Sequence, residues 1–271
     1  MYNDYFRFRE DPFNITPDPR FLYLTTQHRE ALQHLVYGLR ERKGFICLTG
    51  EVGTGKTTLC RALLNRLGPS VRTALILNPV LTETQLLRAI IEEFGIPSKR
   101  RDRLGYLNLL NEFLLRVNSA GHDAVLIIDE AQDMSVGALE MVRLLSNLET
   151  ERQKLLQIVL VGQPELRRML ERPALRQLSQ RITVRYHLDP MDRRETAAYL
   201  NHRLRVAGRE DGPLVHFDAG AVREIYRFSR GTPRLINAIG DKALLAGYVY
   251  RTARINRRLA RLAAAELKGA R

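Results

Sequence analysis

The sequence contains no tryptophan and only two cysteines, Cys47 and Cys60, among its 271 residues. Two cysteines cannot build a disulfide framework, so the composition fits a reducing compartment. Stretches without a charged residue reach only ten residues, whereas a membrane-spanning helix needs roughly 20 apolar residues. The amino terminus also lacks the basic stub and apolar run of a signal peptide. We therefore expect a soluble, cytoplasmic protein with no transmembrane segment in this chain.

Lysine is scarce too, since six lysines accompany 37 arginines among the 43 basic residues. With 30 acidic residues, the formal net charge is +13. The excess is concentrated in residues 223–271, which hold twelve basic and three acidic residues. Such a segment could bind nucleic acid, an anionic membrane surface or an acidic partner. An arginine-rich solvated surface explains the same charge, so composition leaves these alternatives open.

Short apolar runs alternate with amphipathic patterns in the first two thirds of the chain. The amphipathic patterns predict helices over residues 27–42, 57–67, 82–94, 104–117 and 135–148. The apolar runs predict strands over residues 45–48, 73–77, 124–128, 157–161 and 182–186. Strands that alternate with helices in this way favour a parallel sheet covered on both faces.

The pattern changes after Pro190, where further helices begin at Asp192, Asp218, Thr232 and Asn256 and no strand pattern remains. The first 26 residues mix prolines with aromatic residues, which suits an extended arm packed on a domain rather than a helix. The sequence therefore predicts three parts. These are an amino-terminal arm over residues 1–26, an α/β domain over residues 27–190 and a small all-helical domain over residues 191–271.

A glycine-rich loop follows the first expected strand and precedes a helix. It matches the phosphate-binding pattern G-x-x-x-x-G-K-[ST]. Its glycines let backbone N–H groups surround phosphates at a helix N-terminus. Lys56 would reach the outer phosphates, and the Thr57 hydroxyl would bind Mg²⁺. We therefore assign nucleotide binding to Gly50, Glu51, Val52, Gly53, Thr54, Gly55, Lys56, Thr57 and Thr58.

Two acids follow the third expected strand, Asp129 and Glu130. Ligands of open α/β sheets bind at the carboxyl ends of the strands. We expect Asp129 to hold Mg²⁺ and Glu130 to orient and polarise an attacking water. Taken alone, two acids after a strand often mark a solvated loop. The phosphate loop about 70 residues upstream favours the catalytic interpretation.

Three further polar residues are candidates for contacts with the γ-phosphate. Gln163 follows the fourth expected strand, where a polar side chain could sense the phosphate or simply end the strand. Arg181 precedes the fifth strand. Arg234 lies in the first turn of a lid helix, where a cation opposes the helix dipole, so its placement favours an anionic ligand. For both arginines the alternative is an ordinary surface position.

Together these motifs resemble the AAA+ ATPases, and more narrowly the ATPase region of the general secretion pathway protein A (ExeA-like) family. The resemblance covers nearly the whole chain. Besides the phosphate loop, it rests on Glu10-Asp11-Pro12-Phe13, Thr16-Pro17-Asp18-Pro19, His28 to Leu32, Arg42 to Phe45, Asp129 to Gln132 and Val161 to Leu166.

The resemblance implies a P-loop NTPase of the AAA+ type, with a parallel five-stranded sheet of order 5-1-4-3-2. A small all-helical lid would follow the sheet, and ATP with Mg²⁺ would lie between them. By the same resemblance Gln163 is the first sensor and Arg234 the second. Arg181, with Arg176 as the alternative, would be an arginine finger that reaches the ATP of a neighbouring subunit in a homo-oligomer. The arm around Phe13 would lie near the adenine, together with Tyr23.

The function implied by the resemblance is Mg²⁺-dependent ATP hydrolysis that drives assembly or remodelling of a cell-envelope machine. A membrane or envelope protein would be the partner, and either this partner or a missing carboxyl-terminal region would recruit the chain to the inner membrane. The alternative is a DNA-binding AAA+ switch of the transposition or replication-loading type, motivated by the basic residues 223–271. Family members that act in secretion continue into a membrane helix and a peptidoglycan-binding domain. We expect this chain, which stops at Arg271, to be a truncated cytoplasmic region or a short soluble relative.

Overall fold

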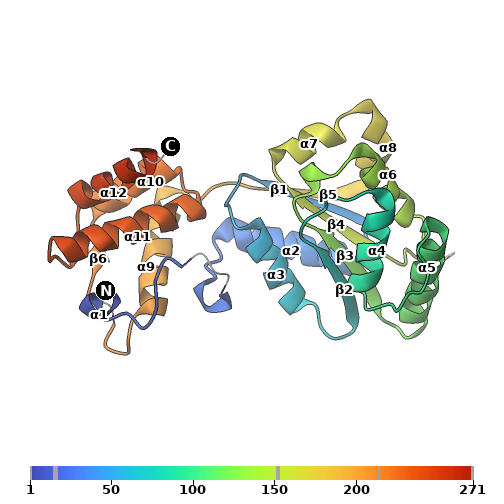
Figure 1. Ribbon diagram of the computed structural model, residues 1–271, viewed down its shortest axis with the longest axis horizontal. Helices are drawn as coiled ribbons and strands as arrows, with labels where there is room; N and C mark the ends of the chain where they lie inside the picture. The colour runs from blue at the N-terminus through green and yellow to red at the C-terminus, as the bar shows by residue number, and fades with distance from the viewer. Residues whose placement is uncertain (1, 15–17, 151–152, 213, 270–271) are drawn as a thin grey trace. The chain divides into compact units, whose positions relative to one another are not determined.

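The computed structural model describes residues 2–14, 18–150, 153–212 and 214–269. Within them the chain forms two compact units (Figure 1). The α/β unit comprises residues 27–50 and 56–188, and the helical unit comprises residues 1–26, 51–55 and 189–271. Thr16 and Pro17, which belong to the expected arm motif, lie outside the described residues. None of the described helices combines the length and the apolar character that a membrane crossing requires.

The α/β unit is built on a five-stranded parallel sheet. Its order is β2-β3-β4-β1-β5, which confirms the order expected from the resemblance. The inner strands are almost entirely buried because helices cover both faces, whereas the edge strands are only half buried. The strands are β1 (Phe45–Gly50), β2 (Val71–Ile76), β3 (Asp123–Ile128), β4 (Gln157–Gly162) and β5 (Ile182–Leu188).

Helices connect these strands and surround the sheet, as Figure 1 shows. Thr82 begins one of them with the capping box that its spacing to Gln85 predicts. The helices are α2 (Thr26–Arg40), α3 (Lys56–Arg66), α4 (Glu83–Glu93), α5 (Arg103–Ser119), α6 (Val136–Leu145), α7 (Pro164–Leu170) and α8 (Arg176–Arg181), with the short 3₁₀ turns η2 (Ala131–Asp133) and η3 (Pro173–Leu175).

The helical unit contains segments from both the start and the end of the chain. Its elements are α1 (Tyr2–Phe6), η1 (Pro19–Phe21), α9 (Arg193–Ala207), β6 (His216–Phe217), α10 (Ala219–Ser229), α11 (Pro233–Val249), β7 (Arg254–Ile255) and α12 (Arg257–Gly269). The expected carboxyl-terminal helices are present. Two features differ from the expectation, namely the helix α1 within the arm and the parallel pair β6–β7 within the lid. An element of two to five residues is too short to show a periodic pattern.

Residues 2–14 and 18–26 belong to the helical unit. The rings of Phe6, Phe8, Phe13 and Phe21 are buried in its core. Arg203 of α9 is buried, and its guanidinium donates to the carbonyl oxygens of Pro12 and Asn14 at 2.5 and 2.7 Å. The same guanidinium lies 4.4 Å from the centre of the Phe21 ring. One buried side chain therefore fixes the arm to α9.

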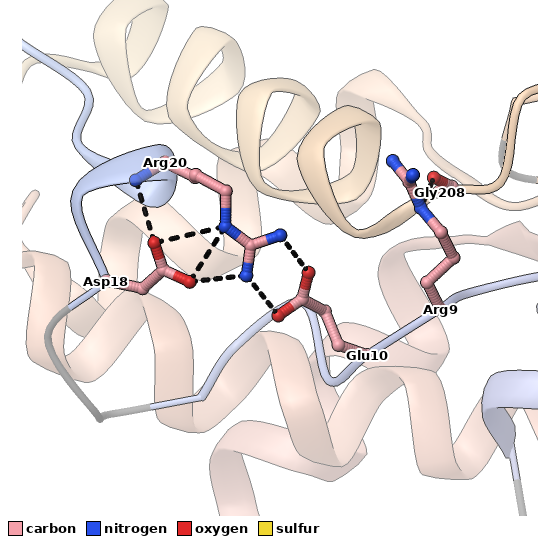
Figure 2. A network of polar contacts seen from close by, with 5 residues as sticks. All are labelled: Arg9, Glu10, Asp18, Arg20 and Gly208. Carbon is pink, nitrogen blue, oxygen red and sulfur yellow. Dashed lines mark hydrogen bonds and ion pairs between the residues drawn. The ribbon is translucent and has the colours of Figure 1, made fainter.

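A second polar network ties the arm to itself and to the loop after α9 (Figure 2). Arg20 binds the carboxylates of both Asp18 and Glu10, with its Nη1 2.8 Å from Glu10 Oε1. Arg9 donates from Nε to the Gly208 carbonyl at 3.0 Å. The two hydrogen-bonding partners hold the pKa of the Arg20 guanidinium above its usual value, and Arg20 links Glu10 to Asp18.

Candidate active site

The phosphate loop is the short turn between β1 and α3. Gly53 and Gly55 have φ values of +79° and +101°, a region that favours glycine. Thr54 closes the turn, because its hydroxyl donates to the Glu51 carbonyl at 2.8 Å. Gly53 and Gly55 therefore stand where the backbone conformation favours glycine. Of the other predicted residues here, Gly50 is the buried end of β1, Val52 is half exposed and Thr58 lies in α3.

Lys56 is the first residue of α3 and is only 6% exposed. Its ammonium donates to the carbonyl oxygen of Gly50 at 2.8 Å. A cation at a helix N-terminus opposes the helix dipole, and an anion bound in the loop would offset this unfavourable interaction.

Thr57 and Asp129 meet although 72 residues separate them. The Thr57 hydroxyl donates to Asp129 Oδ2 at 2.5 Å, and Asp129 Oδ1 accepts from the Glu130 N–H at 2.9 Å. Asp129 is 2% exposed. Hydroxyl and carboxylate oxygens side by side suit Mg²⁺, which takes one or two protein ligands and completes its shell with phosphates and water. In the described part of the chain no cluster of three or more His, Cys, Asp or Glu could hold a metal unaided.

Glu130 is held by two amides. Its Oε2 accepts from Gln132 Nε2 at 2.8 Å and from Gln163 Nε2 at 3.2 Å. Gln132 Oε1 in turn accepts from the Gln163 backbone N–H at 2.9 Å. The ends of β3 and β4 are thereby joined through side chains, and Gln163 lies where the sequence placed it, within reach of the acid.

Gln132 is a residue to which the sequence assigned no role. It belongs to the quoted Asp-Glu-Ala-Gln segment, and the turn η2 brings it back over the end of β4. A Cβ atom at Gly162 would lie 2.8 Å from Gln132 Oε1, so a larger residue there would displace the Gln132 amide. The only sequence signal was a polar side chain two positions after the acid pair, which is too common a feature to single it out.

Arg181 is engaged within its own unit. Its Nη1 donates to Ser146 Oγ at 2.5 Å, to Asn147 Oδ1 at 2.7 Å and to the Arg143 carbonyl at 3.3 Å. These groups lie at the carboxyl end of α6, where a cation is favourable to the helix dipole. The side chain of Arg176 is exposed, and no hydrogen bond or ion pair of it occurs among the described residues. The two finger candidates thus differ in how firmly they are held.

Arg234 and the aromatic residues of the arm belong to the helical unit. Arg234 lies in the first turn of α11, and a Cβ atom at Gly53, which groups with the same unit, would lie 2.8 Å from Arg234 Cβ. Phe13 is buried against Phe217 and is therefore a core residue. Tyr23 is half buried and packs against His202, with ring centres 5.4 Å apart. Of the two residues expected near the adenine, only Tyr23 keeps an exposed surface.

The chain is similar to known proteins in sequence and in fold. The family described as AAA domain matches residues 39–170. General secretion pathway protein A of Aeromonas hydrophila is 48% identical over 272 residues, which cover 100% of this chain and 49% of that protein. The chain therefore spans about half the length of this curated relative.

Solved structures share the fold at low sequence identity. The ORC2 protein of Aeropyrum pernix, in ADPNP–ADP complexes, superposes with a TM-score of 0.69 and 20% identity over 96% of this chain and 72% of that chain. The RuvB Holliday junction branch migration motor of Thermotoga maritima superposes with a TM-score of 0.58 and 20% identity. The match covers 89% of this chain and 68% of that chain. At such identities the likeness concerns the fold alone.

Proposed function

Because the chain belongs to the AAA+ ATPases related to general secretion pathway protein A, we propose that its ATP hydrolysis is Mg²⁺-dependent and drives assembly or remodelling of a cell-envelope machine. The observation that carries the chemistry is the meeting of Thr57, Asp129 and Glu130 at the same edge of the sheet as Lys56. The envelope role is supported by the secretion pathway after which the relative is named. The chain itself is an ATPase.

The residues at the sheet edge divide the work of hydrolysis. The loop N–H groups and Lys56 bind the phosphates, and Thr57 and Asp129 would hold Mg²⁺, which when bound supplies positive charge to the phosphate oxygens. Glu130 accepts a hydrogen bond from the attacking water. Its Oε2 is held by the two amides, whereas no hydrogen bond of Oε1 occurs among the described residues, which leaves that oxygen for the water.

The sensors and the finger complete the proposal. Gln163 lies beside Glu130 and would contact the γ-phosphate, and Arg234 would do so from the first turn of α11. Arg181 would leave the end of α6 and act on the ATP of a neighbouring copy. Arg176 is the alternative, because its exposed side chain has no described hydrogen bond or ion pair to break.

Cell fractionation of the source organism tests the envelope role. Glu130→Gln should bind ATP without turnover, and Lys56→Ala should bind no ATP. If the ATP state engages an envelope partner, the Glu130→Gln chain is enriched in the membrane fraction relative to Lys56→Ala. Equal distribution of the two variants would contradict the envelope role and leave the ATPase assignment untouched.

A second candidate function is DNA binding by the helical unit. Arg223, Arg230, Arg251, Arg258 and Arg261 are exposed, and none of them has an ion pair among the described residues. Arg227, Arg254 and Arg257 are instead paired with Glu224 or Asp218. Phosphate contacts release counterions, so duplex binding should fall steeply between 50 and about 200 mM salt. Absence of duplex binding at about 50 mM salt would exclude this function.

A further inference from the structure

A cavity of about 490 Å³ opens in the α/β unit, away from the phosphate loop. It lies where α4 and α5 end and where β2 and β3 begin, and we call it the basic cavity. Arg72, Arg116 and His122 line it together with Phe94 and Phe113. Its volume falls within the range of roughly 300–1,000 Å³ that is typical of ligand sites.

The basic cavity and the phosphate loop lie at opposite ends of the parallel strands. Arg72 is the second residue of β2 and His122 directly precedes β3, whereas Asp129 directly follows β3. A strand of six residues separates its two ends by roughly 16 Å, at about 3.3 Å per residue. A ligand in the basic cavity would therefore not touch the residues assigned to ATP.

The charges that line the basic cavity are all of one sign. No acidic residue is among its lining residues. The side chains of Arg72, Arg116 and His122 take part in no hydrogen bond or ion pair among the described residues. The adjacent carboxylate, Asp123, is paired with Arg42 at 2.8 Å. Two arginines without partners on one concavity suit a carboxylate or phosphate, which guanidinium groups bind in a bidentate way.

The wall of the basic cavity is apolar. Phe94 and Phe113 are half buried against the core of the α/β unit, with ring centres 5.2 Å apart and ring planes tilted by 41°. Two tilted and half-buried rings do not form the flat exposed platform on which nucleic acid bases stack. They do contribute an apolar wall, on which one large side chain could pack, to a cavity that Arg72 and Arg116 also line.

We infer that the basic cavity binds an acidic segment of a partner protein, in which a large apolar side chain stands next to carboxylates. The apolar side chain packs on Phe94 and Phe113, and the carboxylates pair with Arg72 and Arg116. Aromatic and arginine contacts of this kind carry much of the energy of protein interfaces. This surface is distinct from the residues proposed for ATP hydrolysis.

The absence of tryptophan from the chain makes a direct experiment simple. The probe is an acetylated ten-residue peptide with one tryptophan between glutamates, and tryptophan emission is followed as the full chain is added. Binding should shift the emission to shorter wavelength. The double variant Arg72→Ala with Arg116→Ala should lower the affinity roughly tenfold or more, because hydrogen bonds to charged groups are lost.

A matched control separates the cavity from overall charge. Arg61→Ala with Arg66→Ala removes the same charge from exposed positions on α3 and should change the affinity less than about twofold, the scale of weak screening at a distance. Ala120→Tyr, which fills the cavity from an exposed position at the end of α5, should also weaken binding. Thermal unfolding and ATP turnover should remain at the wild-type level in all three variants.

Four results would overturn the inference. One is equal affinity of the wild type and the cavity variants, and another is equal binding of a peptide with glutamines in place of the glutamates. The third is a single-stranded oligonucleotide that binds in an Arg72- and Arg116-dependent manner when the peptide does not. In the last, the wild type self-associates, the cavity substitutions abolish this association, and the peptide does not bind. The cavity would then belong to an interface with a second copy, which would also overturn the inference.

Discussion

At the scale of single residues, Glu130 is one of five described non-glycine residues whose φ is positive. Its φ of 49° is in the left-handed region, which costs a non-glycine residue about 1–3 kcal/mol. The amides of Gln132 and Gln163 both donate to its Oε2. The strained backbone and the two amides together aim one carboxylate in one direction. Such strain persists only where the surrounding contacts determine it, and here they are side-chain contacts from the ends of two strands.

Two substitutions separate nucleotide binding from turnover. Lys56→Ala should abolish tight ATP binding, because it removes the cation at the start of α3. Glu130→Gln should preserve binding and lower turnover by roughly 10²–10⁴-fold, the usual contribution of a general base. Titration calorimetry with Mg-ATP and a phosphate-release assay measure the two effects. Unchanged turnover in Glu130→Gln would remove Glu130 from the chemistry.

Gln132 should act as a positioning residue. In Gln132→Glu the new carboxylate can still accept from the Gln163 N–H, but it repels Glu130 instead of donating to it. We expect kcat to fall roughly 10- to 100-fold, corresponding to about 1.4–2.7 kcal/mol, while the Kd for ATP and the unfolding temperature change little. Gln177→Glu, at an exposed position on α8, is the control. A parallel loss of stability and activity would indicate a structural role only.

Local motifs could be predicted at this scale, and tertiary contacts could not. The phosphate loop is recognisable because its glycines and lysine are neighbours in sequence, and Gly53 and Gly55 have the φ values expected of such a loop. The partners of Arg181 lie 34 to 38 residues away, at the end of α6. Their proximity depends on how α6 and α8 pack, which no local pattern encodes. The catalytic roles remain predictions.

At the scale of secondary structure, burial explains what the sequence could predict. The inner strands β1, β3 and β4 are nearly continuous apolar runs because helices cover both of their faces, and their bounds were predicted to within one or two residues. The pair β6–β7 and the helix α1 depend on their position against the helical core rather than on a periodic pattern. The order of the sheet followed from the resemblance and not from periodicity.

The attachment of the arm to α9 should depend on Arg203. Arg203→Met removes two hydrogen bonds from a buried guanidinium to carbonyl oxygens. The free energy of unfolding of the helical unit should fall by about 2–4 kcal/mol, since the Pro12 and Asn14 carbonyls lose a charged donor. Chemical denaturation measures the change. Arg205→Met, on an exposed position of the same helix, should change it by less than about 0.5 kcal/mol.

His202 should make the helical unit less stable in mild acid. Burial, with Arg205 and Arg203 nearby, lowers the pKa of this imidazole, and its Nε2 is buried without a hydrogen-bond partner among the described residues. The unfolded chain therefore binds the proton more readily, and stability decreases as pH falls through about 6.5.

The variant His202→Gln isolates this effect. Unfolding temperatures measured between about pH 7.5 and 5.5 should fall less steeply in the variant than in the wild type. Ion pairs with Arg20 and Lys154 lower the pKa values of Asp18 and Glu149. Their contribution to the stability of the protein is therefore lost only at lower pH, below about 4.5. Parallel curves for the variant and the wild type would show that His202 does not titrate in this range.

At the scale of the whole molecule, each unit has a core of its own. The helical unit takes its core from both ends of the chain, since Phe6 and Phe8 are buried with residues of α10, α11 and α12. The candidate catalytic residues Lys56, Asp129 and Glu130 all belong to the α/β unit or its border with the loop. The proposed chemistry also requires an arginine finger, which a second copy of the chain would supply.

Mixed oligomers test whether that element is Arg181. Glu130→Gln removes the acid of its own site but keeps the finger, and Arg181→Ala keeps the acid but lacks the finger. Each variant alone should be nearly inactive. The loss of a finger supplied in trans should lower the turnover rate by roughly 10³-fold or more. When the two are mixed, Arg181 of one copy can serve Glu130 of another, so activity should rise above the sum of the separate rates.

The same mixing with Arg176→Ala decides between the two candidates, because only the true finger variant is rescued by Glu130→Gln. Arg172→Ala, at a nearby exposed position, should keep wild-type activity without any partner. In the wild type the ATPase rate per chain should increase with protein concentration, because the complete site forms only between copies. A rate per chain that is independent of concentration, with no rescue in either mixture, would show that hydrolysis is completed within a single chain and that Arg181 serves only to cap α6.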